Sequence, residues 1–279
     1  MKQPKYTAMI FMVIFAVLPG TAPGQPKEQG RLIFEEGFES GQPPYRASGN
    51  SPEVIKVSDA RAGDYVMKSE LNSSSEDPER TEAVVFIDEE RLMFEIGQEY
   101  WVGISIKLDE NFRDSTEFKD QGMLLQWHYQ DKNHPEVRDA QPLLLRFKND
   151  EVRVHNEVLE EYMARTSPEY GKWIDWVFHV RFSDTDGIIE VWRQGTKIVD
   201  FRGDNHQVEK HEGAYLKFGL YSSQYEKAPL KGSINRTVYH DELRIAGSDG
   251  SYDLVVPRDS KRSEDHESEQ ASGQERPAR

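Results

Sequence analysis

The sequence contains no cysteine among its 279 residues. This absence excludes disulfide bonds, thiolate nucleophiles, zinc fingers and iron–sulfur clusters together. Basic residues are also scarce, since 35 Lys and Arg stand against 50 Asp and Glu and give a formal net charge of -15. A chain this acidic does not hold phosphates non-specifically, so we do not expect nucleic acid as a partner.

Long hydrophobic runs are missing as well. The apolar run 8–18 follows Lys2 and Lys5 and precedes the small residues and prolines of PGTAPGQ. This run is shorter than the roughly 20 residues that span a bilayer, and the layout is that of a secretory signal. We therefore expect a signal peptide over 1–24, a linker over 25–31, and a secreted or periplasmic protein with no membrane contact after cleavage.

Helical periodicity is scarce, and 157–165 is the best candidate for a short helix. Strand-like runs instead fill a domain that we place at 32–256, and Arg193-Gln194-Gly195 between two of them predicts a hairpin turn. The segment 257–279 has no aromatic or branched aliphatic residue and is expected to be a disordered polar tail. The strand-like runs are 100–108, 122–129, 142–149, 176–182, 187–192, 197–201, 215–221 and 237–245. So many strands in one stretch predict an all-β fold, a jelly-roll sandwich of two antiparallel sheets.

Three strand-like segments share an unusual polar face. Side chains at positions i and i+2 of a strand point to the same side. The outer face of a sheet is normally wetted by Lys, Glu, Thr and Ser, whereas here proton carriers and hydrogen-bond donors gather, which suggests a face lined for an anionic ligand. The residues on this face are Arg80 and Glu82, then Leu124, Gln126 and His128, then Tyr215, Lys217 and Tyr221.

Taken in order, RTE (80–82), QWH (126–128) and YLKFGLY (215–221) resemble the three motifs of alginate lyases of polysaccharide lyase family 7, which read R-[ST]-E, Q-[IV]-H and Y-F-K-A-G-x-Y. The stretches 176–195 and 237–247 resemble the broader clan that includes glucuronan lyase and the heparin lyase I type. The resemblance covers about 30–250 and implies a concanavalin-like β-jelly roll with a substrate groove on its concave sheet.

Two positions depart from the family pattern. Val84 stands where the family usually has a second Arg, and Ser223 stands where the last motif usually continues to a Gln. These departures put alginate as the substrate in doubt more than they do the chemistry.

The resemblance implies β-elimination on a uronic-acid-containing polysaccharide. Such a lyase removes the C5 proton of a uronate and expels the 4-linked oxygen, so the site must first neutralise the neighbouring carboxylate. Arg80 and Gln126 suit this role as a charged and a neutral donor. His128 and Tyr221 are the candidates for the base and the acid, and which of them is the base stays open.

Four further residues are expected to bind substrate or support the site. Lys217 either favours the phenolate of Tyr221 or binds a neighbouring substrate carboxylate. Glu82 is expected to pair with a cation and hold Arg80 or a neighbour in place. Tyr215 shares the face of Lys217, and Arg146 alternates with apolar residues and is expected to face the same groove.

The expected partner is an anionic polysaccharide such as glucuronan, alginate or a heparin-like chain, and we expect a monomer. Catalysis of this kind needs no cofactor. The stretches 34–41 and 239–245 resemble the paired terminal strands of jelly-roll carbohydrate proteins, which often hold a structural Ca²⁺. By that resemblance Glu39 and Asp241 are the expected ligands.

Two other classes of function compete with a lyase. A glycoside hydrolase of the laminarinase type needs two carboxylates about 5–5.5 Å apart in the retaining case, and neither motif strand supplies such a pair. A non-catalytic lectin-like module needs aromatic side chains but neither base nor acid. Its candidate sugar-stacking residues are Trp101, Trp127, Trp173, Trp176 and Trp192.

Overall fold

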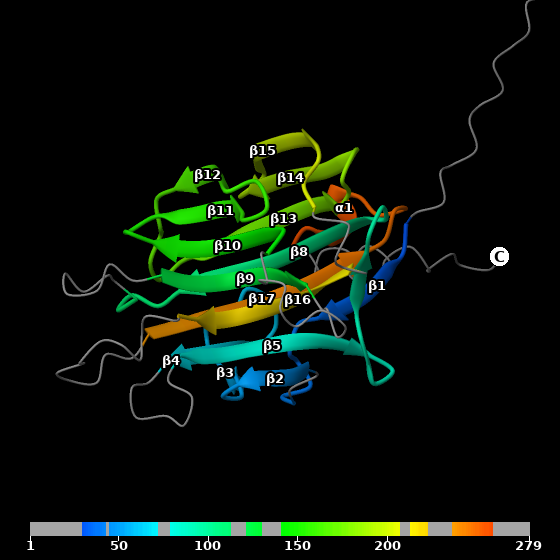
Figure 1. Ribbon diagram of the computed structural model, residues 1–279. Coiled ribbons are helices and arrows are strands. Elements are labelled where there is room, and N and C mark those ends of the chain that lie inside the picture. The colour runs from blue at the N-terminus through cyan, green and yellow to red at the C-terminus, as the bar shows by residue number, and fades with distance from the viewer. Residues whose placement is uncertain are drawn as a thin grey trace, which may run out of the picture.

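The computed structural model describes residues 30–42, 45–71, 79–112, 121–129, 141–206, 213–222 and 236–258. The strands of this part of the chain form two antiparallel sheets, stacked as a sandwich (Figure 1). This is the predicted all-β jelly roll. The expected signal peptide lies outside the described residues, as does the tail from 259 onward. No helix in the described ranges is long and apolar enough to cross a membrane.

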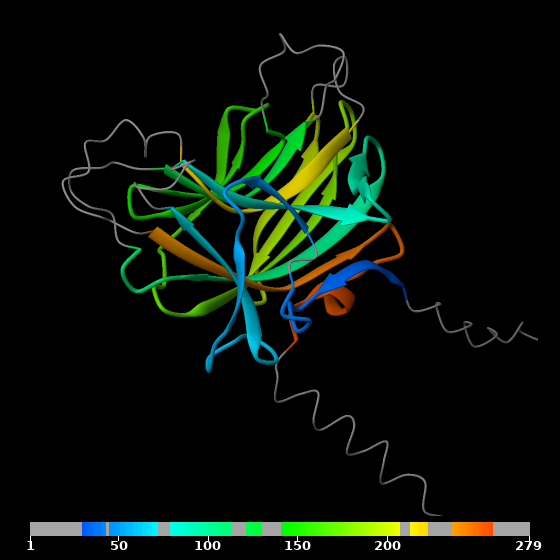
Figure 2. The ribbon, with the colours of Figure 1, turned by 90° about the horizontal axis from the view of Figure 1, so that it is seen from below.

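The first sheet has eight strands among the described residues, and β1 (Leu32–Glu36) joins it by pairing with β17. Figure 2 views the ribbon from below, with β17 (orange) of this sheet and β16 (yellow) of the other in separate layers. The remaining strands in spatial order are β15 (Thr196–Gly203), β14 (Gly187–Arg193), β13 (Trp173–Arg181), β8 (Glu99–Leu108), β17 (Arg236–Ala246), β4 (Tyr65–Leu71) and β3 (Glu53–Lys56).

The second sheet has nine strands in the described ranges. Seven follow one another across the sheet, while β6 (Glu90–Arg91) pairs with β5 and β7 (Met93–Glu95) pairs with β16. The seven in spatial order are β12 (Glu161–Thr166), β11 (Val152–Asn156), β10 (Leu143–Lys148), β9 (Gln121–Tyr129), β16 (Gly213–Tyr221), β5 (Arg80–Ile87) and β2 (Tyr45–Gly49).

The core lies between the two sheets and is rich in aromatic rings. Trp127 of β9 is fully buried and contacts Phe178 of β13 edge-on, with ring centroids 5.2 Å apart. Phe94 meets the same indole at 5.8 Å. Trp176 is also buried in this core. Two of the five tryptophans considered for sugar stacking therefore belong to the core.

The short helix α1 (Tyr252–Val255) packs outside the first sheet, against β8, β13 and β17. Ser251 caps it, and Val255 is completely buried. The close approach depends on Gly103 of β8, where any side chain would overlap the carbonyl oxygen of Val255.

The eight predicted strands all appear, and Gln194 and Gly195 form the predicted hairpin turn with left-handed backbone angles. The expected helix over 157–165 is wrong. Residues 157–160 form a turn in which the side chain of Asn156 accepts the amide of Leu159, and the rest becomes β12. Register with β11 decides this, since the pairing gives β12 ladder hydrogen bonds and packing that an isolated helix of nine residues could not outweigh.

Candidate active site

The three motifs lie on three adjacent strands of the nine-stranded sheet, although they are far apart in sequence (Figure 1). Strand β16 lies between β9 and β5, so Lys217 stands directly opposite Gln126 and Tyr221 stands directly opposite Arg80. We call this surface the motif face: the outer face of the nine-stranded sheet around Arg80, Gln126, His128, Lys217 and Tyr221. The structure thus brings all the predicted catalytic residues onto one side of one sheet.

Glu82 fixes two of these side chains from below. It is only 1% exposed, and its carboxylate accepts a hydrogen bond from the Gln126 amide nitrogen. The guanidinium of Arg80 lies 3.6 Å from the other carboxylate oxygen. The hydrogen bond to Glu82 uses one of the two amide N–H groups of Gln126. Because the amide is planar, the same contact also fixes the direction of the second N–H group. The predicted pairing of Glu82 with a cation matches this geometry.

His128 has a defined tautomer. Its Nδ1 lies 2.6 Å from the backbone carbonyl oxygen of Tyr129, which can only accept a hydrogen bond, so Nδ1 carries the proton in the neutral ring. Nε2 is then the nitrogen that can accept a proton. The imidazole tilts against the ring of Tyr215, with centroids 5.3 Å apart. The ring of Tyr215 is in turn covered by the guanidinium of Arg91 at 4.1 Å, a cation that the sequence motifs did not include.

Tyr221 is held by a cation and by an unusual backbone. The guanidinium of Arg80 lies over its ring, 4.4 Å from the centroid. Two residues earlier, Gly219 has a φ of 139° and stands opposite Glu82. A side chain at Gly219 would collide with the backbone of β5 at Thr81. Glycine is therefore required for β16 and β5 to approach closely enough to place Tyr221 beside Arg80.

The predicted placement of Leu124 on the motif face is wrong. Strand β9 has a bulge at this point, so Leu124 and Leu125 both point into the core and the alternation resumes at Gln126. The carbonyl oxygen of Leu124 accepts a hydrogen bond from Nε2 of His240, which is fully buried on β17 of the other sheet. Burial lowers the pKa of His240 to about 4 and keeps it neutral in this contact. Strict alternation cannot reveal such a bulge.

Arg146 lies on the same outer side, on β10, as predicted. It is 6% exposed, and its NH1 nitrogen lies 3.3 Å from Nδ1 of His155 and 3.8 Å from a carboxylate oxygen of Glu157. His155 stacks on Tyr162 with ring centroids 4.4 Å apart. His155 had no supporting pattern in the sequence, and its neighbours become visible only through the pairing of β10, β11 and β12.

The carboxylates expected to bind calcium hold backbone amides. Glu39 accepts the amides of Asp64 and Tyr65. Asp241 accepts the amides of Arg61, Ala62 and Glu242, and burial raises its pKa to about 7. The described residues include no group of three or more His, Cys, Asp or Glu placed to hold a metal ion. These contacts give no support to the calcium expectation, which stays untested.

The motif strands do not offer the paired carboxylates of a hydrolase. Across the sequences of β5, β9 and β16, Glu82 is the only acidic residue. Asp88 and Glu89 form the turn between β5 and β6, with φ values of 48° and 68°. A retaining mechanism with two carboxylates flanking one bond has no basis on these three strands.

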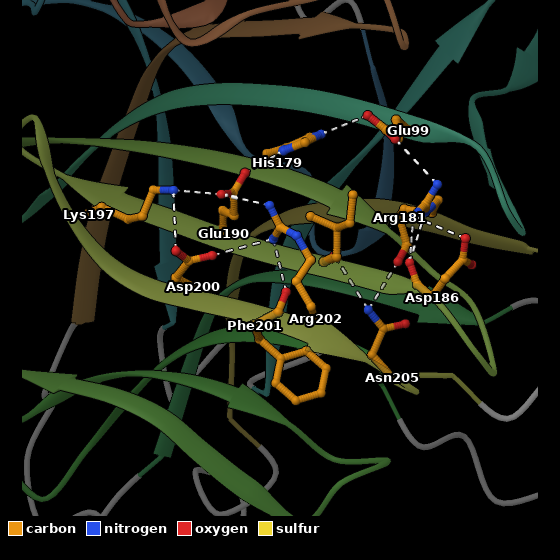
Figure 3. A network of polar contacts seen from close by, with 11 residues as sticks. Glu99, His179, Arg181, Asp186, Glu190, Lys197, Asp200, Phe201, Arg202 and Asn205 are labelled. Atoms are coloured by element: carbon orange, nitrogen blue, oxygen red, sulfur yellow. Dashed lines mark hydrogen bonds and ion pairs between the residues drawn. The ribbon is translucent and has the colours of Figure 1, made fainter.

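A second polar cluster lies on the outer side of the other sheet (Figure 3). We call it the network face: the group of Glu99, His179, Arg181, Asp186, Glu190, Lys197, Asp200 and Arg202. The carboxylate of Glu190 accepts a hydrogen bond from Nδ1 of His179 at 2.6 Å and forms an ion pair with the guanidinium of Arg202 at 2.9 Å. Trp101 stacks on His179 at 4.0 Å and on Trp192 at 5.8 Å. This cluster shares no strand with the motif face.

Comparison with known proteins identifies a family. The family model described as polysaccharide lyase matches residues 35–244, more than half of the chain. No curated protein sequence matches.

Among solved structures, the endo-β-1,4-glucuronan lyase from the fungus Trichoderma reesei is similar with a TM-score of 0.63 and 15% identity, over 82% of this chain and 100% of that chain. An alginate lyase is similar with a TM-score of 0.51 and 10% identity, over 76% and 95%. The marine alginate lyase from Zobellia galactanivorans gives 0.49 and 13%, over 69% and 83%. The first two likenesses show the shared jelly-roll fold.

Proposed function

The chain belongs to the polysaccharide lyase family, and from this premise we propose that it cleaves a uronic-acid-containing polysaccharide by β-elimination on the motif face. The observation that carries the proposal is the convergence of Arg80, Gln126, His128 and Tyr221 on three neighbouring strands. A carboxylate clamp, a base and an acid must all reach one sugar ring, and this arrangement supplies the four groups side by side.

In the proposed reaction, Arg80 and Gln126 bind the substrate carboxylate. Removal of the C5 proton places a second negative charge next to that carboxylate, so donors aimed at it stabilise the transition state more than the ground state. Glu82 orients both donors, because its buried carboxylate contacts the Gln126 amide and the Arg80 guanidinium. Glu82 acts here as a positioning residue.

Proton transfer falls to His128 and Tyr221. The Nδ1–H of His128 is directed to the Tyr129 carbonyl, so its Nε2 takes the C5 proton. The electron pair of the C5–H bond forms the C4–C5 double bond, the C4–O4 bond breaks, and the hydroxyl of Tyr221 gives its proton to the leaving oxygen. Exchange with water then restores both groups.

The substrate we propose is a polysaccharide with 4-linked uronate units, such as glucuronan, alginate or a heparin-like chain. We further propose that the protein acts outside the cytoplasm, on the basis of the signal-like segment 1–24, which lies outside the described residues. Intact-mass analysis of the exported protein tests this, and a retained Met1 contradicts it.

The deciding experiment follows the ultraviolet absorbance of the unsaturated uronate on a panel of uronate polymers and a neutral β-1,4-glucan. Absorbance should rise with at least one uronate polymer and not with the glucan. Tyr221→Phe keeps the ring but removes the phenol, and it should lower kcat by about 10²–10⁴-fold. The matched control is Tyr252→Phe on α1, which should keep full activity. Reducing ends without absorbance would indicate a hydrolase, and binding without either would indicate a lectin-like module.

A further inference from the structure

Three arginines continue the motif face across the neighbouring strands. In the strand register Arg80 stands opposite Tyr221, Tyr221 opposite Met123, and Met123 opposite Arg146. Arg146 then stands opposite Arg153, and Arg153 opposite Arg165. These six residues form one row at right angles to the strands. The row runs from Arg80 in the proposed carboxylate clamp to the sheet edge at β12, and its last three members are Arg146, Arg153 and Arg165.

The outward positions of β10, β11 and β12 carry positive charge without matching acids on the strands. They are Leu144, Arg146, Lys148, Arg153, His155, Tyr162 and Arg165. No Asp or Glu is among them, in a chain whose formal net charge is -15. The acids that approach come from the turns, where Glu151 pairs with Arg153 at 2.7 Å and Glu157 reaches Arg146 only at 3.8 Å.

Two of the arginines have capacity for a further anion. The Nε of Arg146 has no hydrogen-bond partner. It is buried, as is 92% of the Arg146 side chain. A buried donor left unpaired costs free energy that a bound acceptor would recover. Arg165 is exposed, stacks over the Tyr162 ring at 5.1 Å, and pairs with no carboxylate of the described residues.

Two titratable side chains report the positive potential of this region. The pKa of His155 falls to about 4, first because of burial and then because of Arg146, Lys148 and Arg153. Burial alone would raise the pKa of the Tyr162 phenol, yet Arg146 and Lys148, with hydrogen bonds from Arg153 and Lys148, lower it. An acid and a base shift in the directions that a cationic site imposes on each.

We propose that Arg146 and Arg165 form a second carboxylate-binding subsite, which holds uronate units on one side of the cleaved bond, while Arg153 between them stays paired with Glu151. The proposal rests on the β-elimination proposed for the motif face. Neighbouring strands lie about 4.8 Å apart, close to the length of one sugar unit, so a chain lying along the arginine row places about one uronate over each strand. The unit cleaved over β9 and β16 then has its next neighbours over β10, β11 and β12.

The subsite predicts a length-dependent contribution to binding. A polyuronate that covers β9 to β12 reaches the guanidiniums of Arg146 and Arg165, and a planar guanidinium suits a carboxylate with two parallel hydrogen bonds. A uronate dimer bound at the clamp does not reach Arg165. The arginine row should therefore lower the KM of long substrates and leave kcat, which depends on the clamp, the base and the acid, nearly unchanged.

The test compares Arg165→Gln and Arg146→Gln with Arg202→Gln, which removes one positive charge from the network face. For the uronate polymer that the wild type cleaves best, KM should rise about threefold in Arg165→Gln and about tenfold in Arg146→Gln, with kcat within twofold. For the dimer or trimer, kcat/KM should change less than twofold in Arg165→Gln. Arg202→Gln should match the wild type throughout.

A binding arm separates this proposal from the proposed reaction. Calorimetry with saturated uronate heptamer on the Tyr221→Phe background should give a Kd that rises by the same factors, while a neutral glucan heptamer shows no dependence on the arginines. Arg165 is exposed, so Arg165→Gln should fold even if Arg146→Gln does not. Unchanged affinity in Arg165→Gln and Arg146→Lys alike would overturn the subsite, even with elimination intact. Lost affinity without elimination on any polymer would instead reject the proposed reaction.

Discussion

The two outer faces of the sandwich use the same residue types in opposite ways. On the network face each cation meets a carboxylate: Glu190 binds Lys197, Arg202 and His179, and Asp200 binds Lys197 and Arg202. On the motif face the strands β5, β9 and β16 carry one acid, Glu82, buried beneath Arg80 and Gln126. The first arrangement pairs each cation with acids of its own cluster, whereas the second places Arg80 and Gln126 on one buried carboxylate.

Under the proposed function, this difference separates a structural cluster from a functional one. A closed network satisfies its own charges, so an added anion gains little there and the contacts serve stability. In the proposed function, the donors that buried Glu82 holds on the motif face are preorganised for the substrate carboxylate. Substitutions of matched size on the two faces should therefore change different properties.

The largest effect is expected for His128→Ala. Removing the proposed base should lower kcat by about 10²–10⁴-fold while leaving the melting temperature close to that of the wild type. Added imidazole should restore part of the activity, because it enters the space that the ring leaves. The equivalent change on the network face, His179→Ala, should lower stability and keep kcat. Full activity of His128→Ala would remove this residue from the mechanism and weaken the contrast between the faces.

A smaller effect is expected for Glu82→Gln. The amide keeps the shape but presents an N–H toward Arg80 or Gln126, so both proposed carboxylate donors lose their common support. We expect kcat/KM to fall about 10- to 100-fold, which corresponds to about 1.4–2.7 kcal/mol. The matched control is Glu99→Gln, which removes the same charge beside His179 and Arg181. A similar loss of kcat/KM in both variants would show that removing a carboxylate from either sheet, and not the loss of clamp support, lowers activity.

The sequence predicts the strands of the motif face better than their partners. Runs such as 122–129 and 215–221 combine β-branched or aromatic residues with period-two polarity, and both form strands. The helix predicted over 157–165 is wrong, because β12 is fixed by its register with β11 rather than by its own pattern. Leu124 was misplaced since a bulge depends on the two neighbouring strands and on His240 across the core.

The candidate site divides in the same way. Arg80, Gln126, His128 and Tyr221 sit in motifs that can be read one strand at a time. Arg91, Arg153 and Tyr162 have no such motif, because their relation to the site comes from pairings between strands and from contacts such as that of Arg91 with Tyr215. The sequence does show the cations within 146–165. Without the strand register, however, it could not be predicted on which face of the sheet these cations lie.

Gly219→Ala should lower both stability and activity. Such a result would show that the motif face, unlike the network face, depends on a backbone conformation that glycine adopts easily and alanine does not. The residue has a φ of 139°, and a methyl group there meets β5 at Thr81. We expect a loss of about 1–3 kcal/mol in the free energy of unfolding, measured by urea denaturation, together with lower kcat as Tyr221 shifts from Arg80. Gly97→Ala is the control: its φ is also positive at 80°, but no atom lies near the added methyl group. Equal loss of kcat in both would contradict the placement role of Gly219.

The smallest effect, and the one that tests the network face alone, is the pH dependence of Glu190→Gln. Burial would raise the pKa of Glu190, but hydrogen bonds from Lys197, His179 and Arg202 outweigh it and lower the pKa from 4.5 to about 2. A carboxylate with a depressed folded-state pKa stabilises the fold fully above its unfolded value, and this contribution is lost as the pH falls through the folded value. The difference in unfolding free energy between the wild type and Glu190→Gln should therefore be constant above about pH 5 and shrink between pH 4.5 and 2.

Urea denaturation at a series of pH values measures this difference, with Glu53→Gln as an exposed control that should show no such slope. Elimination activity should stay within twofold of the wild type at neutral pH; a larger loss would mean that the closed network on one face supports the chemistry on the other.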